Sequence, residues 1–294
     1  MNTAAKPKIA IHIIFILMCI TFIIPIMYVI TISISTEQAI EQYGYQLFPN
    51  VVSLDAYRYV FKSSGGILDA YYVTIFMSAA GSVLSLAVMS LVAYPLSSRY
   101  FHFKKSITFY IFFTMLFSGG LIPGYILNTQ YLGLSNNIWV YILPSLANAW
   151  HIVMLRTFFG QLPSGLVESA KIDGANELKI FYSIILPLSK PVLATVLFMT
   201  LLTKWNDWYT TLIFIRNPKL YTLQYLLQRV LREVEFVKNL SLTSPGLNVN
   251  IGEGIPAEPM RFAMVVIAAG PMLAVFPFFQ KYFTRGLTVG AIKG

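Results

Sequence analysis

Charged side chains are scarce in this chain. Only 11% of its 294 residues are Asp, Glu, Lys or Arg, whereas an ordinary soluble domain carries about 25%. Hydrophobic residues make up 56% of the sequence, and aromatic residues make up 15%. A soluble protein of this size would need more charge on its surface. The composition therefore excludes a soluble domain and indicates an integral membrane protein.

Cysteine is also nearly absent. The single Cys19 lies in the middle of an apolar run, and one cysteine cannot form a disulfide within the chain. We expect Cys19 to be a small, buried hydrophobic side chain. The sequence has no repeat of fixed period, which excludes a solenoid.

Nucleotide-binding and metal-binding motifs are missing too. No G-x-x-x-x-G-K-[ST] phosphate loop is present, because Gly290–Gly294 has neither the spacing nor the following hydroxyl. The histidines are far apart, and His151 has no histidine or cysteine at ligand spacing. We therefore expect no metal site, no cofactor and no catalytic residue in this chain.

Long apolar stretches are present instead. A membrane-spanning helix needs about 20 apolar residues. We expect spanning helices at residues 9–33, 70–98, 106–128, 136–156, 188–209 and 262–281. The expected fold class is all-α and membrane-embedded, with residues 1–294 forming one transmembrane domain. The first helix lacks a small-residue cleavage site, so we interpret it as an uncleaved span rather than a signal peptide.

The distribution of basic residues predicts which side each segment faces. If the N-terminus lies in the cytoplasm, six spans return the C-terminus to the same side. The cytoplasmic segments then contain twelve Lys and Arg against three acidic residues, while the outer segments contain nine of each. This asymmetry agrees with the positive-inside rule. Because the basic residues are scattered at helix ends rather than clustered on one face, they do not indicate nucleic-acid binding.

Two of the expected outer segments are long, at residues 37–68 and 210–260. In the second, apolar residues recur at helical spacing from Leu220 to Val237, which predicts an amphipathic helix at the outer surface. Ser241–Glu258 is rich in Ser, Gly, Asn and Pro and lacks this periodicity. Connections longer than about 15 residues are usually functional or disordered.

A polar segment, residues 160–187, lies between the fourth and fifth expected spans on the cytoplasmic side. Pro163-Ser164 favours a helix start, and Gly174 favours its end. A helix of about three turns is marginal in water, so packing against another surface must hold it. A second helix is expected over Glu177–Ile185, and Leu186-Pro187 then leads rigidly into the membrane. An ordinary loop needs no such rigidity, so the segment indicates a docking site for another protein.

The same segment resembles the EAA loop of permease subunits of bacterial ABC importers. The matching residues are Glu168-Ser169-Ala170, Asp173-Gly174-Ala175 and Ile184-Ile185-Leu186-Pro187, with Ser169 in place of the usual alanine. The carbohydrate-uptake branch of that family, which includes the maltose permease, is similar at Trp205-Asn206-Asp207, Gln280–Phe283, Gly286 and Gly290–Gly294. Phe117–Pro123 resembles the subgroup that imports oligosaccharides released from complex polysaccharides.

This resemblance implies the permease fold of a type I ABC importer and a division of labour between chains. The EAA loop forms coupling helices that sit in a cleft of a separate ATPase subunit, where ATP and magnesium bind. The residues implied in this coupling are Glu168, Ser169, Ala170, Asp173, Gly174, Ala175, Leu186 and Pro187. Because the family pairs two such loops, it implies a second permease subunit in a heterodimer, two ATP-binding subunits and an extracytoplasmic solute-binding protein.

Two further segments acquire roles from the resemblance. The tail after the sixth span contains Arg285, Gly286, Gly290 and Lys293 and is expected to reach between the two ATPase subunits. A basic anchor at the lipid surface is the alternative. The outer stretch Thr243–Gly254 is expected to enter the cleft of a docked binding protein and displace sugar, although a simple solvated loop has the same composition.

Polar and aromatic residues in the fourth and fifth spans are candidates for the substrate path, because aromatic faces stack on sugar rings while amides and carboxylates bind hydroxyls. The candidates are Asn148, His151, Trp205, Asn206, Asp207, Trp208 and Tyr209. An aromatic belt at the outer interface is the alternative for the aromatic residues, and packing is the alternative for His151. Small residues at Ser78, Gly81, Ser82 and Ser85 predict tight helix packing.

Two other functions stay open from the residues alone. An ion-gradient-driven secondary transporter predicts internal repeats and carboxylates near the membrane centre, whereas no duplication is apparent and Asp207 lies near a helix end. A membrane-embedded enzyme needs converging His, Asp or Glu side chains, and the histidines at 12, 102 and 151 offer no such cluster.

Overall fold

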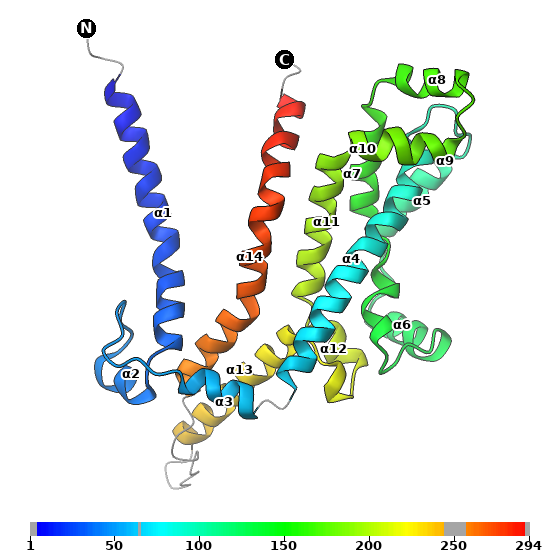
Figure 1. Cartoon of the computed structure of the whole chain (residues 1–294). Helices are drawn as coiled ribbons and strands as arrows, with labels where there is room; N and C mark the ends of the chain where they lie inside the picture. The colour runs from blue at the N-terminus through cyan, green and yellow to red at the C-terminus, as the bar shows by residue number, and fades with distance from the viewer. Residues whose placement is uncertain (1–4, 64–65, 244–256, 292–294) are drawn as a thin grey trace. The chain divides into compact units, whose positions relative to one another are not determined.

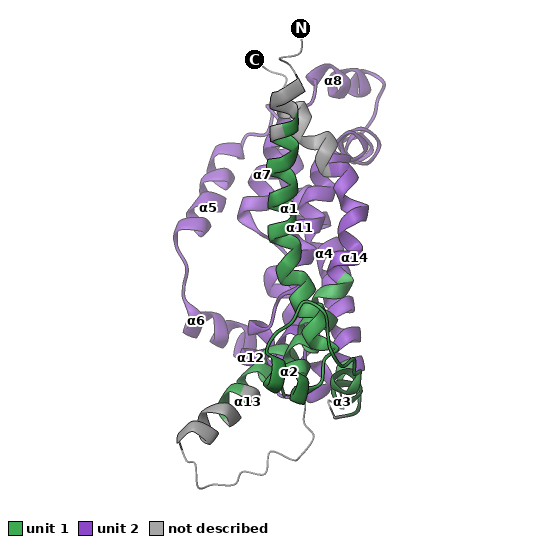
Figure 2. Cartoon of the chain, turned by 90° about the vertical axis from the view of Figure 1, so that its left-hand side faces the viewer, with its two compact units in different colours: residues 1–67, 226–271 green, residues 68–225, 272–294 purple. Residues whose placement is uncertain are grey.

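The protein is all-helical over the residues that its structure, a computed structural model, describes: 5–63, 66–243 and 257–291 (Figure 1). The chain groups into two compact units (Figure 2). Unit 1 comprises residues 1–67 and 226–271, and unit 2 comprises residues 68–225 and 272–294. No β-strand forms in the described ranges.

Unit 1 begins with a long apolar helix. It contains α1 (Ala5–Ser33), α2 (Glu37–Tyr43), α3 (Asp55–Ser63) and parts of α13 (Leu223–Thr243) and α14 (Ala257–Ala291). The apolar part of α1 is 23 residues long, enough to cross a bilayer. Its side chains between residues 11 and 26 are exposed, Cys19 among them. The expectation of a buried Cys19 was therefore wrong, because lipid is as apolar as a protein core and an apolar helix can face it directly.

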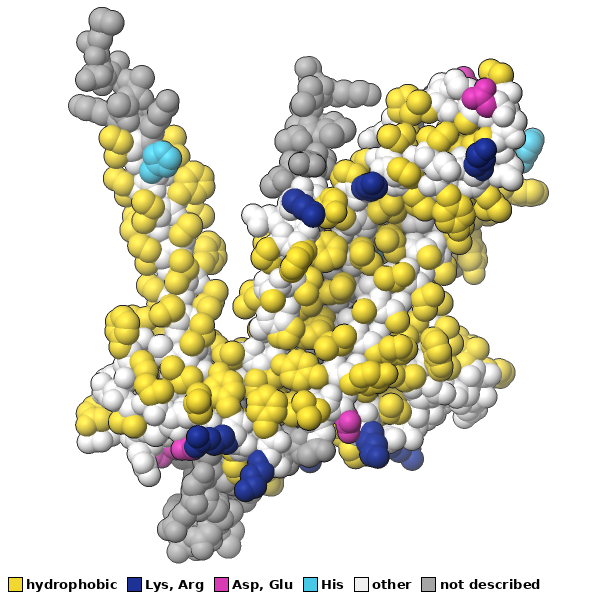
Figure 3. All heavy atoms as spheres, in the orientation of Figure 1, with side chains coloured by type: hydrophobic (Ala, Val, Ile, Leu, Met, Phe, Trp, Pro, Cys, Tyr) yellow, Lys and Arg dark blue, Asp and Glu magenta, His cyan; other side chains and the backbone are white. Residues whose placement is uncertain are grey.

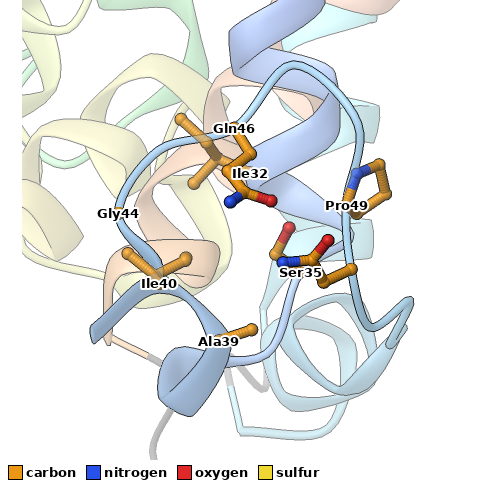
Figure 4. Close-up of a pocket in the computed structure, with 8 residues that line it drawn as sticks. Ile32, Ser35, Ala39, Ile40, Gly44, Gln46 and Pro49 are labelled. Carbon is orange, nitrogen blue, oxygen red and sulfur yellow. The ribbon is translucent and has the colours of Figure 1, made fainter. Parts of the chain in front are cut away.

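The segment after α1 folds back on the end of that helix. Thr36 caps α2 by accepting the amide of Ala39, and Thr31 Oγ1 donates to the carbonyl of Gln46 at 3.1 Å. These turns enclose a hollow of about 10 Å³, which is room for roughly one water molecule (Figure 4). Its lining residues are Ile32, Ser35, Ala39, Ile40, Gly44, Gln46, Pro49 and Asn50. The hollow is too small to hold a solute.

The start of α14 is capped by a side chain from α2. Glu37 Oε2 accepts the backbone amide of Glu258 at 3.0 Å, where a helix N-terminus favours negative charge. Glu258 itself accepts from Tyr45 Oη at 3.3 Å and pairs with Arg261 at 3.2 Å. Burial raises the pKa of Glu37, and the hydrogen bond from Glu258 opposes that effect. These contacts fix the chain after the first span to the start of the last helix.

Unit 2 surrounds the long helix α4 (Ile67–Ser97) with shorter pieces. The next elements are α5 (Lys104–Leu116), α6 (Leu121–Ile126), the π-helix η1 (Leu127–Tyr131), the 3₁₀-helices η2 (Ile138–Tyr141) and η3 (Leu143–Ser145), and α7 (Ala149–Gly160). They are followed by α8 (Ser164–Ile172), α9 (Glu177–Ile180), the π-helix η4 (Phe181–Ile185), α10 (Leu186–Leu188), α11 (Lys190–Trp205), α12 (Tyr209–Phe214) and η5 (Pro218–Leu220).

These helices provide up to six membrane spans. Three unbroken helices, within α1, α4 and α14, are long and apolar enough to cross a bilayer. The other three candidates are bent pairs: residues 104–116 with 121–131 at 112°, residues 138–145 with 149–160 at 49°, and residues 177–188 with 190–205 at 82°. The predicted class, an all-helical membrane protein, is confirmed, and the structure accommodates up to six spans.

The third and fourth spans are broken where we predicted continuous helices. The expected helix at 106–128 divides at Ser118–Gly120, because these residues favour turns over helix. The expected helix at 136–156 begins as two short 3₁₀ turns around Pro144 and becomes α-helical only at Ala149.

The fifth and sixth spans differ from expectation at their ends. The fifth stops at Trp205 rather than at residue 209. The last helix continues to Ala291, so the tail that we expected to leave the span at 281 is helical. Its two glycines, Gly286 and Gly290, cost about 1 kcal/mol each in a helix, which is too little to end it. Lys293 lies outside the described residues, and the side chain of Arg285 is not among those described.

The main core of unit 2 joins four elements: α4, α7, the α9–η4 helix and α11. Its buried residues are Met89, Ala93, Leu96, Ile152, Leu155, Phe159, Ile180, Phe181, Ile185, Val192 and Val196. The ring of Phe181 lies 5.2 Å from that of Tyr94 on α4. Because the α9–η4 helix contributes to this core, the polar segment and the spans are one packed body.

A second core lies nearer the start of α4. Its buried residues are Val73, Met77, Leu134, Val140, Tyr141, Ile142 and Ile215. On the same helix Ser78, Ser82 and Ser85 are buried, and the side chain of Lys204 lies against Gly81. The predicted tight packing of this small-residue face is confirmed. On the face that Figure 3 shows, hydrophobic side chains dominate the surface of unit 2 between its two ends, as a bilayer requires.

We expect Glu37→Gln to raise the unfolding temperature of the protein at neutral pH. Because burial raises the pKa of Glu37, its contribution to stability is fully present below the ordinary value of 4.5 and is lost as pH rises through the raised pKa. Glutamine does not ionise and keeps an oxygen that can accept the Glu258 amide. The difference from wild type should therefore vanish at low pH. Thermal unfolding in detergent across the acidic and neutral range measures this.

Glu41→Gln is the matched control, because Glu41 is exposed on the same helix and its replacement also removes one carboxylate. If Glu37→Gln instead lowers the unfolding temperature at neutral pH, the favourable charge at the N-terminus of α14 outweighs the burial of Glu37.

Candidate functional site

The helix α8 ends in a Schellman turn at Gly174. Gly174 has a φ of 76°, in the left-handed region. Its amide donates to Lys171 O at 3.1 Å, and the amide of Ala175 donates to Ala170 O at 2.9 Å. These bonds satisfy carbonyls that the helix end leaves free. The predicted stop at Gly174 is confirmed. Because a Cβ there would meet nothing within 4 Å, backbone conformation rather than packing requires glycine.

The two faces of α8 have different surroundings. Val167, Ala170 and Ala175 pack against the main core of unit 2. The exposed residues on and after the helix include Glu168, Ser169, Ile172, Asp173 and Gly174. Large apolar side chains are also exposed on this segment: Leu166 at 44%, Ile172 at 86%, Leu178 at 63% and Tyr182 at 58%. A hydrogen-bonded turn keeps these apolar side chains exposed, and exposed apolar side chains that lie together indicate an interaction surface.

Glu177 connects three elements at this end of unit 2. Its Oε1 lies 2.7 Å from Lys171 Nζ on α8, and its Oε2 accepts from Tyr94 Oη on α4 at 2.7 Å. Lys171 and Tyr94 hold the pKa of Glu177 below its ordinary value. The Lys171 ammonium also lies 5.6 Å from the ring centroid of Tyr100. An exposed ion pair alone contributes at most about 1 kcal/mol, so the importance of Glu177 lies in fixing geometry.

The second helix of the segment, predicted over Glu177–Ile185, is formed by α9 and η4. Asn176 caps it by accepting the amide of Lys179 at 2.8 Å. At its other end the amide of Ser189 donates to Ile185 O at 3.0 Å, which carries the chain past Leu186-Pro187 to α11. Leu186 is partly buried and Pro187 is exposed. A capped, hydrogen-bonded connection therefore joins α8 to the start of α11.

The candidates in the fourth span lie at the start of α7. Asn148 is exposed and caps this helix, since its Oδ1 accepts the amide of His151 at 3.1 Å. His151 is half-buried, and its Nδ1 has no hydrogen-bond partner among the described residues. One turn of helix therefore brings an exposed amide close to an imidazole with an unused nitrogen.

The candidates after α11 are engaged mainly in local structure. Trp205 is only 5% exposed. Asn206 Oδ1 accepts from Gln224 Nε2 at 3.2 Å. Asp207 Oδ1 accepts the amide of Thr210 at 3.0 Å, which starts the short helix α12. These three side chains therefore hold the end of the fifth span in place.

The neighbouring aromatic pair is more open. The rings of Trp208 and Tyr209 meet edge to face with centroids 5.8 Å apart, and Tyr209 is 47% exposed. Of the five candidates in this stretch, Tyr209 offers the most accessible aromatic surface to a passing solute.

Helix α7 carries a groove that the sequence reasoning missed. Its volume is about 300 Å³, and its lining residues are Trp150, Val153, Met154, Thr157, Phe158, Gln161 and Val192. Five of them lie on α7 and Gln161 is its C-cap; because these six recur at three- and four-residue spacing, they share one face of the helix. Trp150 is 59% exposed, while Thr157 and Gln161 add a hydroxyl and an amide. The spacing of these residues was a signal that could have been read.

The segment after the fifth span, which we expected on the outer side, contains the predicted amphipathic helix. It is α13, and its first residue, Leu223, is fully buried with its amide donating to Thr74 Oγ1 at 2.9 Å. The stretch Thr243–Gly254, expected to displace solute, lies outside the described residues apart from Thr243, the last residue of that helix.

Known proteins share this sequence and architecture. Residues 9–289 match the family described as "Binding-protein-dependent transport system inner membrane component". "Protein LplC" of Bacillus subtilis (strain 168) is 38% identical over 272 residues, which cover 92% of this chain and 90% of that protein. The "Polygalacturonan/rhamnogalacturonan transport system permease protein YtcP" of the same organism is 36% identical over 280 residues, covering 95% of this chain and 94% of that protein.

A solved structure also matches. It is described as "Crystal structure of a bacterial ABC transporter involved in the import of the acidic polysaccharide alginate", and one of its chains aligns with a TM-score of 0.80 and 28% identity. The alignment covers 96% of this chain and 98% of that chain. The likeness therefore extends over the whole helical architecture.

We expect Gly174→Ala to loosen the end of α8. A Cβ in the left-handed region costs about 1–2 kcal/mol, so the Schellman turn should open more often. Amide hydrogen exchange at Asp173 and Ala175, whose amides donate to Ser169 O and Ala170 O at this turn, should then be faster. Gly174→Asn should be milder, because asparagine visits this conformation more readily.

Gly165→Ala is the matched control, since Gly165 lies inside the same helix and a Cβ there meets open space. It should slow exchange by improving helix propensity. Equal exchange rates in Gly174→Ala and Gly165→Ala would contradict the role of the left-handed turn.

Proposed function

Because this chain belongs to the family of inner membrane components of binding-protein-dependent transport systems, we propose that it forms half of the translocation path of an oligosaccharide importer. The chain is a multi-pass permease component of the cytoplasmic membrane. It works with an ATPase and with a solute-binding protein, as its family does.

The observation that carries the proposal is the rigid, apolar-tipped α8–α9 segment. We assign the ATPase docking surface to Glu168, Ser169, Asp173 and Gly174, with Ala170 and Ala175 holding this surface against the core and Leu186 and Pro187 passing its motion to α11. Support comes from Ile172, which is 86% exposed beside the Schellman turn. Burying a side chain of this size contributes about 1.5–3 kcal/mol, enough to make it an anchor in a cleft of another protein.

The charge distribution supports an orientation with the α8–α9 segment and both termini in the cytoplasm. With that orientation twelve of the basic residues face the cytoplasm against three acidic ones. The tail residues Arg285, Gly286, Gly290 and Lys293 then lie on the ATPase side, where we propose that they contact the ATPase subunits.

A second permease subunit is proposed because the main core of unit 2 leaves one face of α7 uncovered. One chain also supplies one α8–α9 segment, whereas two ATPase subunits require two docking segments. We therefore propose a heterodimer of permease subunits with two ATP-binding subunits, within which residues 1–294 act as a single transmembrane domain.

The relatives support a solute derived from polysaccharides. YtcP is described as a polygalacturonan and rhamnogalacturonan permease, and the matched structure belongs to an importer of alginate. We propose that the solute passes Asn148 and His151 on α7 and the stretch from Trp205 to Tyr209 after α11. In that stretch Trp205, Asn206 and Asp207 shape the wall, while Trp208 and Tyr209 offer aromatic surface. The loop Thr243–Gly254 is proposed to assist release from the binding protein.

We expect Ile172→Asp to abolish ATPase association while leaving the permease in the membrane. Replacing the exposed apolar side chain with a carboxylate removes the anchor and makes its burial unfavourable. Co-purification of the ATPase from detergent-solubilised membranes measures the effect, and we expect a loss of about tenfold or more.

Phe48→Asp is the control, because Phe48 is 78% exposed in the segment after α1 and faces the outer side in the proposed orientation. It should leave ATPase association unchanged. Normal ATPase recovery with Ile172→Asp would contradict the docking assignment.

We further expect cells that lack this chain to lose ATP-dependent uptake of labelled oligogalacturonides. Uptake of labelled glucose serves as the control for membrane energisation. Unchanged oligogalacturonide uptake would contradict the proposed solute class without affecting the ATPase docking assignment.

A further inference from the structure

Lys204 is buried at the end of a membrane span, where the carboxylate of Asp207, three residues later, attracts its charge without forming an ion pair. It lies in the last turn of α11 and is 5% exposed. No ion pair to Lys204 occurs in the part of the chain that the structure describes. Its ammonium instead donates to Tyr141 O at 3.1 Å and to Ser145 Oγ at 2.6 Å. Burying an ammonium within a membrane span costs free energy. The hydrogen bonds to these two acceptors offset that cost.

Pro144 explains why an acceptor is available. In a 3₁₀-helix the carbonyl of one residue accepts the amide three residues later, so Tyr141 O would accept from residue 144. Residue 144 is proline and has no amide hydrogen. A carbonyl left without a donor is unfavourable within a membrane span. The side-chain donors that reach Tyr141 O are Lys204 Nζ and Ser145 Oγ, each at 3.1 Å.

The Ser145 hydroxyl alone cannot donate to both carbonyls, Tyr141 O and Ile142 O, that it reaches at this break. This hydroxyl has one hydrogen, and Ile142 O at 3.3 Å competes with Tyr141 O for it. Lys204 occupies the acceptor side of the same hydroxyl and so turns its hydrogen toward the two carbonyls. The ammonium therefore satisfies Tyr141 O directly and also orients the Ser145 hydroxyl that donates to the carbonyls.

The space for this ammonium comes from Gly81 on α4. A Cβ at Gly81 would lie 2.9 Å from Cδ and Cε of Lys204 and 3.2 Å from its Nζ. Ser85, one turn further along α4, donates to Ser145 O at 3.4 Å. Three elements, α4, the η2–η3 break and α11, thus meet at one side chain.

We propose that Lys204 is a positioning residue of the transport cycle. Its ammonium replaces the amide hydrogen that Pro144 lacks and fastens the broken start of the fourth span to α11. Because α11 continues from the α8–α9 segment, the break moves with α11 when that segment moves. This last consequence rests on the proposed function, whereas the fastening itself does not.

The test uses two spin labels in the assembled complex of permease and ATPase subunits. Cys19→Ser removes the single native cysteine, and Trp139→Cys and Met199→Cys place labels on η2 and α11 at exposed positions. We expect one narrow distance distribution that is the same without nucleotide and with ATP and vanadate. Lys204→Met should broaden it and make it depend on the nucleotide state. It should also lower ATP hydrolysis stimulated by the binding protein about tenfold, as loss of a charged hydrogen bond predicts.

The decisive variant is Lys204→Met combined with Pro144→Ala. Alanine restores an amide hydrogen at residue 144, so the narrow distribution and the ATP hydrolysis should return. Gly81→Ala should reproduce the Lys204→Met defect by displacing the lysine, and the two changes together should do no more than either alone. Lys190→Met is the matched control, because Lys190 is exposed at the start of the same helix.

The proposal is overturned if Lys204→Met changes neither readout, or if Pro144→Ala fails to restore them. If Lys204→Met does not assemble, recovery of assembly by Pro144→Ala decides the question in the same way. Loss of ATPase association in Ile172→Asp is measured separately, so the docking assignment can hold even where the role of Lys204 does not.

Discussion

Within a bilayer every backbone amide and carbonyl must find a partner inside the protein, and this constraint governs how unit 2 is built. Three of its spans interrupt their own helical hydrogen bonds, so side chains have to repair the breaks. Asn136, just before the fourth span, satisfies two amides that follow α12: it adopts a left-handed φ of 54°, and its Oδ1 accepts the amides of Arg216 and Asn217 at 3.1 and 2.8 Å. Lys204 repairs the same span a few residues later.

The two ends of unit 2 meet this constraint with different chemistry. Near the α8–α9 segment the helices share an apolar core, whose contacts are numerous but not directional. At the opposite end of α4 a buried chain of hydrogen bonds runs from Tyr141 Oη to Thr211 and on to Thr222, each at 2.9 Å. Buried polar networks tolerate little displacement. The hydrogen-bonded end therefore keeps its register, while the apolar end can accommodate small sliding movements.

The sequence could predict the features that depend on neighbouring residues, but not those that depend on contacts between distant residues. Apolar length located the spans, and the local chemistry of Gly174 located the end of α8, because both signals lie within a few neighbouring residues. The helix α2 was missed although Thr36-Glu37 is a start signal, because its seven residues are too few to show a helical period of apolar residues. The breaks were harder to place. Whether Pro144 interrupts a span depends on a donor 63 residues away from Tyr141 in the sequence, and hydropathy contains no information about that contact.

The burial of Lys204 also changes the count of basic residues on each side of the membrane. In the sequence Lys204 stands at the end of the fifth span and was counted among the nine basic residues of the outer segments. A buried ammonium that donates to Tyr141 O and Ser145 Oγ does not face the outer solution. Removing it from the count leaves eight basic residues against nine acidic ones on that side. The excess of Lys and Arg on the cytoplasmic side over the outer side therefore grows. Burial of Lys204 thus strengthens the case for a cytoplasmic α8–α9 segment.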